Sequence, residues 1–480
     1  MKFNIHRLWI ALTPRVLLVC LLFIGVFARA FREANDPDMW WHLATGRYIV
    51  EEGRIPKVDV FSYTSANRPW ITHEWLTDVG MYALYRVAGK AALILVPALI
   101  VLGVTVLLYL QCTARPYIAV FATLVGVFTT AVSWGARPQL LNVLFLALLM
   151  YIIEQYRGGR SWTVWLLPPL TALWSNSHAG FMLAPFVVGV VLAGDGLALL
   201  IKHTSSRTLS FPRWRMLAIV FFVCVGAALL NPNGVHMLTY SFDTLGSAAM
   251  QTYITEWASP NFQNPGFWPF ALLLLGGSTL LILARQRIEL TDLTLFMGFA
   301  FAGLLSARHT PLFAVIAPPV ITRAVAHKQP VLAHQRNVPA LNWLILVLAL
   351  VATGLNYRQT LLNDRVQEMQ LYPQAALNYL VSQGWDTKPG YNDYNWGGYL
   401  IWAGIPVFID GRADVHGDAL MREYVQTLHI HENWRAPLDK YGVEYVLIGP
   451  RTPLGVLLKE TAEWKHVYRD DVAVIFVREE

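Results

Sequence analysis

The chain has 480 residues, of which 55% are hydrophobic and only 14% are charged, and its formal net charge is +6. Soluble domains carry roughly a quarter charged residues, so this composition excludes an ordinary soluble protein. Apolar runs of about 20 residues match the length that a helix needs to cross a bilayer, and they predict a polytopic helical membrane protein. The modest positive charge is typical of basic cytoplasmic loops and does not indicate nucleic-acid binding.

Eleven apolar runs are expected to span the membrane. They lie at residues 9–29, 91–111, 117–133, 139–154, 161–174, 179–201, 215–230, 266–284, 290–305, 311–326 and 340–356. The first run follows Lys2 and Arg7 and resembles a signal peptide. Because the chain continues as a multi-span protein, an uncleaved signal anchor is favoured.

Basic residues in the short loops predict the orientation. Lys and Arg occur at the N-terminus and in the connections at 155–160, 202–215, 285–289 and 323–336. With eleven spans, all of these segments fall on one side, which the positive-inside rule makes cytoplasmic. The inner loops otherwise carry mostly Gly and Ser. The alternate loops and the tail from about residue 358 then face outward.

Two outer segments are expected to have structure of their own. In the first outer loop, about 30–90, residues 42–52 and 74–87 predict amphipathic surface helices, with an extended segment at 58–64 between them. The tail predicts a small α/β domain with a helix at 373–383 and buried strands at 406–410, 443–448 and 472–477. We therefore expect a membrane module at 1–357 and an extracytoplasmic domain at 358–480.

Polar and ionisable residues gather at the predicted outer ends of the spans. They are Asp36, Asp38, His42, His73, Glu74, Arg137, Gln139, Asn176, His178, Asn231, Asn233, Glu256, Arg308 and His309. Ionisable groups at membrane depth are costly to bury and usually mark a functional cavity. Carboxylates, imidazoles and arginines on one side predict an outward-facing pocket for acid–base chemistry and anion binding.

Each residue type suggests a role in transferring a sugar from a lipid phosphate. Asp36 or Asp38 can take a proton from an acceptor hydroxyl as general base. Arg137, Arg308 and His309 can supply positive charge for the departing phosphate. Trp41 can form an aromatic wall for the sugar. The residues expected to contact substrate are Trp41, His42, His73, Glu74, Gln139, Asn176, His178, Asn231 and Glu256.

Plainer explanations exist for several of these residues. Asp36 and Asp38 can be helix caps, Arg137 can cap a helix or extend to the interface, and Asn231 can simply begin a turn. His42 and His73 can be packing residues. In the tail, the polar residues either bind the acceptor, cover the cavity or form a network that fixes the tail. These tail residues are Asn392, Asp393, Asp410, Arg412 and Asp414.

The sequence does not clearly indicate a cofactor. Asp36, Asp38 and Glu256 are carboxylates that can together hold a divalent cation such as Mg²⁺ or Mn²⁺, but they lack a defined ligand spacing. There is also no glycine-rich nucleotide-binding loop, which argues against a nucleotide sugar as donor. We therefore assign no cofactor from the sequence and keep the cation as an open alternative.

Several motifs together resemble a known superfamily. The first-loop motif is Asp36-Pro-Asp-Met-Trp-Trp-His-Leu43, and later ones are Trp70-Ile-Thr-His-Glu-Trp-Leu76, Ala307-Arg-His-Thr-Pro311 and Ile409-Asp-Gly-Arg-Ala-Asp414. An acidic motif directly after the first span resembles the GT-C membrane glycosyltransferases, which include protein O-mannosyltransferases, aminoarabinose transferases and oligosaccharyltransferases. The whole set of motifs is similar to that of a group of bacterial GT-C-like proteins.

The resemblance implies an inverting glycosyltransferase in the bacterial cytoplasmic membrane. It implies a polyprenyl-phosphate-linked sugar donor, an extracytoplasmic acceptor, and a first-loop aspartate as base, for which Asp38 is slightly favoured over Asp36. The sugar, the acceptor and the oligomeric state stay open. A flippase for a lipid-linked glycan, which needs charged groups along a path to both faces, and a non-catalytic membrane scaffold are the alternatives.

Overall fold

The computed structural model describes residues 12–202, 204–284, 288–326 and 337–479. Several basic residues used to predict the orientation lie outside this part of the chain, as does the start of the first predicted span. They are Lys2, Arg7, Arg285, Arg287, Lys328 and Arg336. The chain divides into two compact units: unit 1 holds residues up to 32, 94–234 and 256–360, and unit 2 holds 33–93, 235–255 and those from 361 on. Most of the first outer loop and of the tail thus fold into the same unit.

Unit 1 is built from helices. They are α2 (Pro14–Arg29), α6 (Pro116–Thr129), η1 (Thr130–Ser133), α7 (Gln139–Arg157), η2 (Ser161–Leu166), α8 (Leu167–Ser177), η3 (Ala179–Met182), α9 (Leu183–Leu200), α10 (Phe211–Ala228), η5 (Pro265–Phe267), α13 (Trp268–Ala271), η6 (Leu272–Gly276), α14 (Gly277–Leu283), α15 (Leu290–Leu305), η7 (Ala307–His309) and α16 (Thr310–Val325). Two long helices, α5 (Lys90–Gln111) and α17 (Pro339–Leu371), and the short η4 (Thr255–Trp257) contain unit boundaries.

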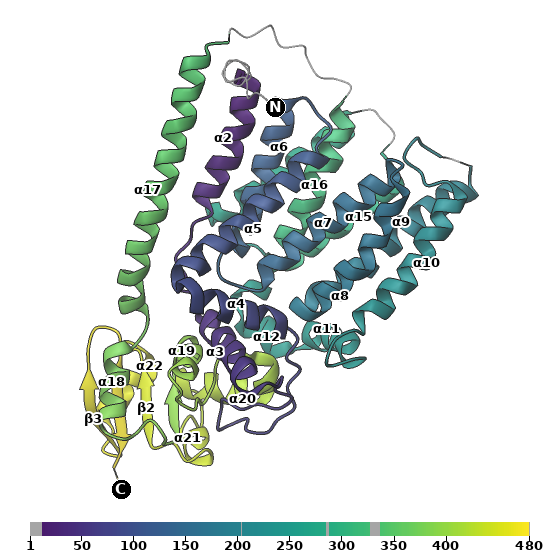
Figure 1. Cartoon of the computed structure of the whole chain (residues 1–480). Coiled ribbons are helices and arrows are strands. Elements are labelled where there is room, and N and C mark those ends of the chain that lie inside the picture. The colour runs from purple at the N-terminus through teal and green to yellow at the C-terminus, as the bar shows by residue number, and fades with distance from the viewer. Residues whose placement is uncertain (1–11, 203, 285–287, 327–336, 480) are drawn as a thin grey trace. The chain divides into compact units, whose positions relative to one another are not determined.

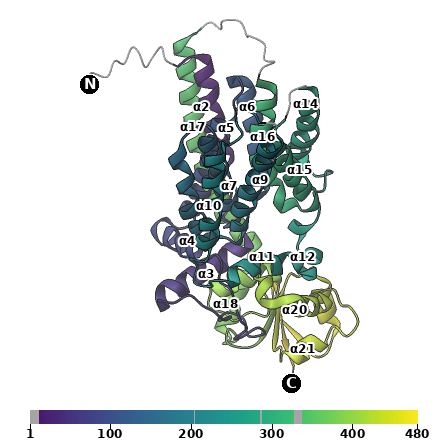
Figure 2. The same ribbon diagram turned by 90° about the vertical axis from the view of Figure 1, so that its right-hand side faces the viewer.

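The central helix of unit 1 is α16. Its residues from 310 to 322 are all buried, and it packs against α6, α7, α14 and α15 (Figure 1 and Figure 2). A helix that is apolar on every side is stable only when other helices or lipid surround it. The surrounding helices are correspondingly more exposed and apolar, as expected of a bundle embedded in a bilayer.

Seven of the described helical segments are long and apolar enough to cross a membrane. They are Lys90–Gln111, Pro116–Ser133, Gln139–Arg157, Ala179–Leu200, Phe211–Ala228, Pro265–Leu283 and Pro339–Leu371. The other predicted spans correspond to the shorter helices α2, α8, α15 and α16. The protein is thus a polytopic helical membrane protein, while the count of eleven spans and the orientation stay predictions.

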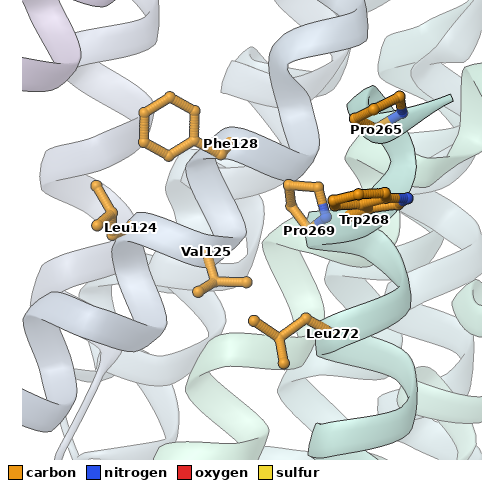
Figure 3. Close-up of a pocket in the computed structure, with 7 residues that line it drawn as sticks. All are labelled: Leu124, Val125, Phe128, Pro265, Trp268, Pro269 and Leu272. Atoms are coloured by element: carbon orange, nitrogen blue, oxygen red, sulfur yellow. The ribbon is translucent and has the colours of Figure 1, made fainter.

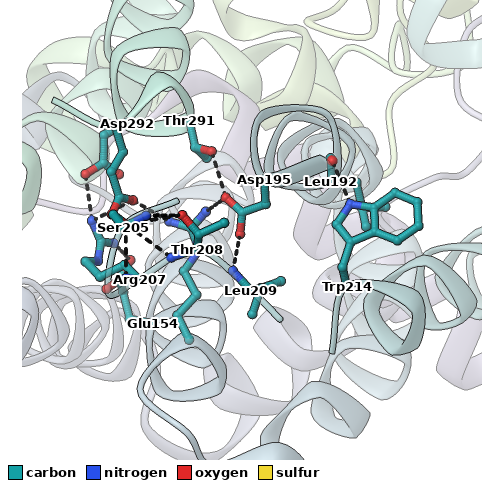
Figure 4. A network of polar contacts seen from close by, with 12 residues as sticks. Glu154, Leu192, Asp195, Ser205, Arg207, Thr208, Leu209, Trp214, Thr291 and Asp292 are labelled. Atoms are coloured by element: carbon teal, nitrogen blue, oxygen red, sulfur yellow. Dashed lines mark hydrogen bonds and ion pairs between the residues drawn. The ribbon is translucent and has the colours of Figure 1, made fainter. Parts of the chain in front are cut away.

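A buried network of charged residues joins four helices of unit 1 (Figure 4). Arg157 of α7 donates to Asp195 of α9 at 2.5 Å, and Arg323 of α16 donates to Asp292 of α15 at 3.0 Å. Arg207, between α9 and α10, donates to Asp292 at 2.8 Å. Its further members are Glu154, Ser205, Glu289 and Thr291. These helix ends adjoin the loops that the sequence places inside, so basic residues of that predicted side pair with carboxylates at the helix ends.

Unit 2 contains shorter helices and a small sheet. Its helices are α3 (Pro37–Glu52), α4 (Trp75–Ala88), α11 (His236–Gly246), α12 (Ala248–Tyr253), α18 (Gln374–Ser382), η9 (Tyr394–Trp396), α19 (Gly397–Trp402), α20 (Ala413–Leu428), α21 (Ala436–Lys440), α22 (Pro453–Leu457) and η10 (Leu458–Glu460). Its strands are β1 (Gly390–Asn392), β2 (Tyr445–Ile448), β3 (Trp464–Arg469) and β4 (Val474–Arg478). The helix predicted at 373–383 is confirmed as α18.

The sheet has the strand order β1-β2-β4-β3, with β1 parallel to β2 and the other pairs antiparallel. The strands predicted at 443–448 and 472–477 are confirmed as β2 and β4. The strand predicted at 406–410 is wrong, because Val407 forms only an isolated bridge with Ser62 of the first loop. The apolar side chains of that segment are buried, and Phe408 contacts both Tyr63 of the first loop and Tyr391 of β1.

Helix α3 begins with an N-cap and ends at a glycine. The Asp36 side chain accepts a hydrogen bond from the Asp38 backbone N–H at 2.9 Å, and Pro37 occupies the first turn. Residues 39–46 are all buried, since α3 packs against α4 and α19. The helix predicted at 42–52 ends where predicted but begins earlier, at Pro37, and its residues up to 46 are buried, whereas residues 50–52 are exposed. Gly46 is required at this crossing, where a Cβ would lie 2.1 Å from the Asp78 carbonyl oxygen.

Candidate functional site

The two first-loop aspartates have different surroundings in unit 2. The Asp36 carboxylate caps α3, as described above. The Asp38 carboxylate is partly exposed, and its Oδ1 accepts a hydrogen bond from the Trp41 indole Nε1 at 3.1 Å. Asp36 is thus occupied with helix formation, while the Asp38 side chain is oriented by one aromatic donor. This favours Asp38 as the acid–base group.

Behind Asp38, a buried imidazole–carboxylate pair supports the first turns of α3. The ring of Trp41 lies on the imidazole of His42, with 3.5 Å between the centroids. His42 Nδ1 lies 2.7 Å from Oδ1 of Asp78, which projects from α4 and is fully buried. Burial lowers the pKa of His42, but the charge of Asp78 and the hydrogen bond to it raise the pKa above its usual value. Burial in turn raises the pKa of Asp78 to about 6.

Asp78 was missed by sequence reasoning, although a signal exists. It follows Glu74 by four residues, so the two carboxylates lie on the same face of α4. A second carboxylate on the buried face of an otherwise apolar helix indicates a buried partner. That partner is His42, which the sequence did place among the candidate residues.

His73 and Glu74 extend this cluster toward two other segments of unit 2. His73 Nε2 lies 3.4 Å from Glu74 Oε1, and Glu74 Oε2 lies 3.7 Å from His42 Nε2. The His73 ring also lies 4.4 Å from the ring of Tyr240 in α11, whose hydroxyl donates to Asp414 Oδ2 at 3.0 Å. Burial lowers the pKa of His73, but the Glu74 carboxylate outweighs it and, with smaller contributions, raises the pKa to about 9. His73 is therefore an imidazolium at neutral pH.

In the tail, two of the predicted polar residues form a buried ion-pair network with the first loop. Arg412 donates to both carboxylate oxygens of Asp410, at 2.8 and 2.7 Å, and to Asp59 at 2.7 Å. Asp410 Oδ2 also lies 3.0 Å from His416 Nε2. Burial raises the pKa of Asp410, but the charges of Arg412 and His416 hold it well below its usual value. These contacts favour the alternative in which Asp410 and Arg412 fix the tail.

Two other tail residues also serve local structure. The Asn392 amide donates to the Ile409 carbonyl at 2.8 Å and accepts from the Phe408 N–H at 2.9 Å. Asp393 caps η9 by accepting from the Asn395 N–H. Both sets of contacts shape the segment that leads from β1 to α19.

In unit 1, the two predicted phosphate-binding arginines converge on neighbouring residues of η4. The Arg137 guanidinium forms an ion pair with Glu256, and the Arg308 guanidinium lies 4.6 Å from the centre of the Trp257 ring. The segment before η7 is tied to the same turn, because the Ser306 hydroxyl donates to the Glu256 carbonyl at 3.0 Å. Residues more than a hundred positions apart thus place two cations at one turn.

His309 and Gln139 each lie close to one of these arginines in the chain: His309 directly follows Arg308, and Gln139 follows Arg137 by two positions. Burial and the neighbouring Arg308 charge lower the pKa of His309 to about 4. His309 is therefore neutral at pH 7 and can offer a phosphate a hydrogen bond but no charge. Gln139 is the first residue of α7, two positions after Arg137.

The predicted site residues Asn176, His178 and Asn231 hold the end of α8. Asn176 Nδ2 donates to the Leu230 carbonyl and Asn231 Nδ2 to the Ser175 carbonyl, each at 2.7 Å. Asn231 also accepts from the Asn233 N–H at 2.8 Å, which forms the turn expected as its plainer role. His178 Nδ1 accepts from a backbone N–H two residues later, at 2.9 Å. Their contribution to substrate binding stays a prediction.

The carboxylates considered for a metal do not lie in the same compact unit. Asp36 and Asp38 belong to unit 2, while Glu256 belongs to unit 1 and is paired with Arg137. Within the described part of the chain, no group of three or more His, Cys, Asp or Glu residues is arranged to hold a metal ion. A divalent cation stays an alternative from the sequence without further support.

An apolar groove of about 430 Å³ runs along α6 in unit 1 (Figure 3). Its walls come from α6 and from the segment between η5 and η6. The lining residues are Leu124, Val125, Phe128, Pro265, Trp268, Pro269 and Leu272. None of the seven carries a charge, so the groove suits a hydrocarbon chain.

Comparison with solved structures identifies the fold. The chain is similar to the archaeal oligosaccharyltransferase AglB from Archaeoglobus fulgidus, in complex with an inhibitory peptide and a dolichol-phosphate: TM-score 0.59, 12% identity, covering 97% of this chain and 74% of AglB. It is also similar to ArnT from Cupriavidus metallidurans bound to undecaprenyl phosphate: TM-score 0.52, 14% identity, covering 96% and 97%. No protein-family profile and no curated protein sequence matches the chain. The protein thus has the GT-C fold, as the resemblance implied.

Proposed function

We propose that this protein is an integral membrane glycosyltransferase that moves a sugar from a polyprenyl-phosphate carrier to an extracytoplasmic hydroxyl acceptor. The GT-C fold supports the general kind of activity, and two similar structures contain dolichol-phosphate and undecaprenyl phosphate. The observation that carries the proposal is the Asp38 carboxylate, which is partly exposed and oriented by Trp41 at the start of α3.

Asp38 acts as general base in this reaction. Its Oδ1 accepts the hydrogen bond from Trp41, and we assign the proton transfer from the acceptor hydroxyl to Oδ2. The acceptor oxygen attacks the anomeric carbon from the face opposite the phosphate, and a new glycosidic bond forms with inverted configuration. The bond between the anomeric carbon and the phosphate oxygen breaks, and the polyprenyl phosphate leaves with that electron pair. General-base catalysis of this kind contributes about 10²–10⁴-fold to rate.

Arg137 and Arg308 bind the phosphate. A guanidinium matches phosphate oxygens with a planar pair of donors and stabilises the charge that develops on the leaving group. Glu256 holds Arg137 in place in the structure, and Trp257 holds Arg308. His309, neutral at pH 7, adds at most a ring N–H to this arrangement.

The groove along α6 receives the isoprenoid chain of the donor. Its uncharged lining gives no partner to a polar ligand and is compatible with a hydrocarbon chain. The two segments that line the groove are close in the chain to the phosphate-binding residues. Helix α6 is followed by η1 and then by Arg137, and Glu256 and Trp257, which hold the two arginines, precede Pro265. A lipid phosphate presents both an anion and a hydrocarbon chain, which matches these two features.

The flippase alternative needs charged groups that line a path to both faces. The charged network of Figure 4 is the feature that would supply them at the predicted inner side. However, its arginines and carboxylates are bonded to one another, and the side chains of Arg157 and Asp195 are only 2% and 4% exposed. A network closed in this way fixes helices and offers no passage to a ligand, so it gives no support to a flippase.

The proposal is tested by assaying the purified full-length protein in lipid nanodiscs with polyprenyl-phosphate sugars, scoring both transfer and acceptor-free hydrolysis. The Asp38→Asn variant should lose about 10²–10⁴-fold in turnover, because the amide cannot accept the proton. Asp36→Asn is the matched control, since Asn caps a helix about as well as Asp and should preserve turnover and melting temperature. Full activity in Asp38→Asn would overturn the assignment of the base.

A further inference from the structure

We propose that the tail loop at 409–414 belongs to the catalytic centre as its positioning element, with Gly411 as the residue that fixes the place of the Asp38 carboxylate. The inference rests on the proposed role of Asp38 as base. It assigns a function to a motif for which the sequence left acceptor binding, cavity closure and simple anchoring as alternatives.

Gly411 lies directly against the hydrogen bond between Asp38 and Trp41. A Cβ built on Gly411 would stand 1.8 Å from Asp38 Oδ1 and 3.2 Å from Trp41 Nε1. Heavy atoms in proteins do not approach so closely, so any side chain here must displace the carboxylate. The backbone of Gly411 does not have a positive φ angle. Glycine is therefore needed for space and not for backbone conformation.

The loop around Gly411 is held by the buried network described above. Arg412 follows Gly411 in the chain and is 1% exposed. Its guanidinium binds Asp410, which precedes Gly411, and Asp59 of the first loop. The Arg412 guanidinium also lies over the rings of Phe61 and Trp70, at 5.1 and 4.7 Å from their centres. Buried charges fully paired in this way confine a segment to one position.

A second tail segment touches the same turn of α3. A Cβ on Gly398, in α19, would lie 2.6 Å from the Pro37 carbonyl oxygen and 3.2 Å from the Trp41 backbone nitrogen. The first turn of α3 is therefore enclosed by two close backbone approaches from the tail. These approaches explain why glycine occupies position 398 in α19 and position 411 in the tail loop.

This arrangement makes the tail a support for the base. With Oδ1 held by Trp41 and covered by Gly411, the carboxylate has one fixed orientation and presents Oδ2 for proton transfer. A displacement of about 1 Å of a reacting group can cost on the order of 10²-fold in rate. Gly411 and Trp41 are positioning residues in this scheme, because both act through Asp38.

The test uses the full-length protein and the assay described above. Gly411→Ala should lower kcat by about 10²-fold with the donor KM within about threefold of wild type, because only the base moves. Gly80→Ala is the matched control: it lies in α4 of the same unit, and a Cβ there meets no atom within 4 Å. If Gly411→Ala does not fold, Trp41→Phe replaces it in the test. This variant keeps a ring over His42 but removes the indole N–H that binds Asp38. It should lower kcat without changing the KM for the sugar donor.

A chemical readout separates this inference from the role of Asp38 itself. Modification of Asp38 by a water-soluble carbodiimide, followed by mass spectrometry, should be several-fold faster in Gly411→Ala or Trp41→Phe than in wild type. In the Asp38→Asn background, Gly411→Ala should cause no further loss of kcat. Unchanged kcat and unchanged modification in both variants would overturn the positioning role. Changed modification together with an active Asp38→Asn variant would overturn only the assignment of the base.

Discussion

At the scale of single residues, His73 shows how one neighbouring carboxylate sets the charge of a site. Burial disfavours the imidazolium, but Glu74 at 3.4 Å overcomes this and is the main cause that raises the pKa of His73 to about 9. An unfolded histidine has a pKa of about 6.5. The folded protein therefore binds this proton more tightly than the unfolded chain does.

The sign of the resulting pH dependence follows from linkage. Because the pKa of His73 is higher in the folded than in the unfolded protein, protonation of His73 stabilises the fold. This stabilisation, on the order of 3 kcal/mol, is complete below about pH 6.5 and is lost as pH rises toward 9. The melting temperature of the purified protein should therefore fall between pH 6.5 and 9. His73→Gln should flatten this fall, whereas His429→Gln, at an exposed position of the same unit, should leave it in place. An equal slope in all three proteins would contradict the assignment.

The residues around α3 show what the sequence can and cannot predict about the site. Asp36 followed by Pro37 is a recognisable helix start, and the cap it forms was among the expected roles. The contacts of Asp38 with Gly411 and of His42 with Asp78 depend on packing between segments that are distant in the chain. No periodicity in either segment carries that information.

At the scale of elements, periodicity predicted the helices well and failed where packing overrides it. The apolar segment at 406–410 has strand character, yet it packs on the first loop, because Arg412 and Asp59 hold it there. Helix α17 was predicted to end near 356 but continues to Leu371. Residues 355–371 contain no Gly or Pro and include good helix formers, so the helix extends beyond the apolar stretch.

The charged network of unit 1 connects elements and can be tested as such. Arg157→Met leaves Asp195 and Glu289 without one of their partners in a buried position, which typically costs about 3–5 kcal/mol. We expect a clear loss of folded protein on heating, measured by fluorescence-detected size-exclusion chromatography. Arg160→Met is the control, because Arg160 is exposed three residues later and its loss should change stability by less than about 0.5 kcal/mol. Equal losses in the two variants would show that the network is not stabilising.

At the scale of the whole molecule, helix α17 is longer than a membrane crossing requires. It has 33 residues, which at ~1.5 Å per residue make roughly 50 Å, longer than the ~30 Å hydrocarbon core of a bilayer. Only 6% of the residues in its most apolar 18-residue window are buried within the protein, as expected of a helix that contacts lipid. Its polar second part, which leads into the tail, therefore extends beyond the hydrocarbon layer.

The predicted orientation follows from the basic loops and can be tested with a pair of isosteric substitutions. In a background in which Cys20, Cys112 and Cys224 are replaced by alanine, Ser382→Cys in the tail and Ser161→Cys, directly after the 155–160 connection, each place one thiol at an exposed position. A membrane-impermeant maleimide should label the Ser382→Cys variant in intact spheroplasts and the Ser161→Cys variant only after permeabilisation. This result is required if Asp38, which folds with the tail in unit 2, works on an extracytoplasmic acceptor. The reverse labelling pattern would place the proposed base on the cytoplasmic side and exclude the proposed acceptor.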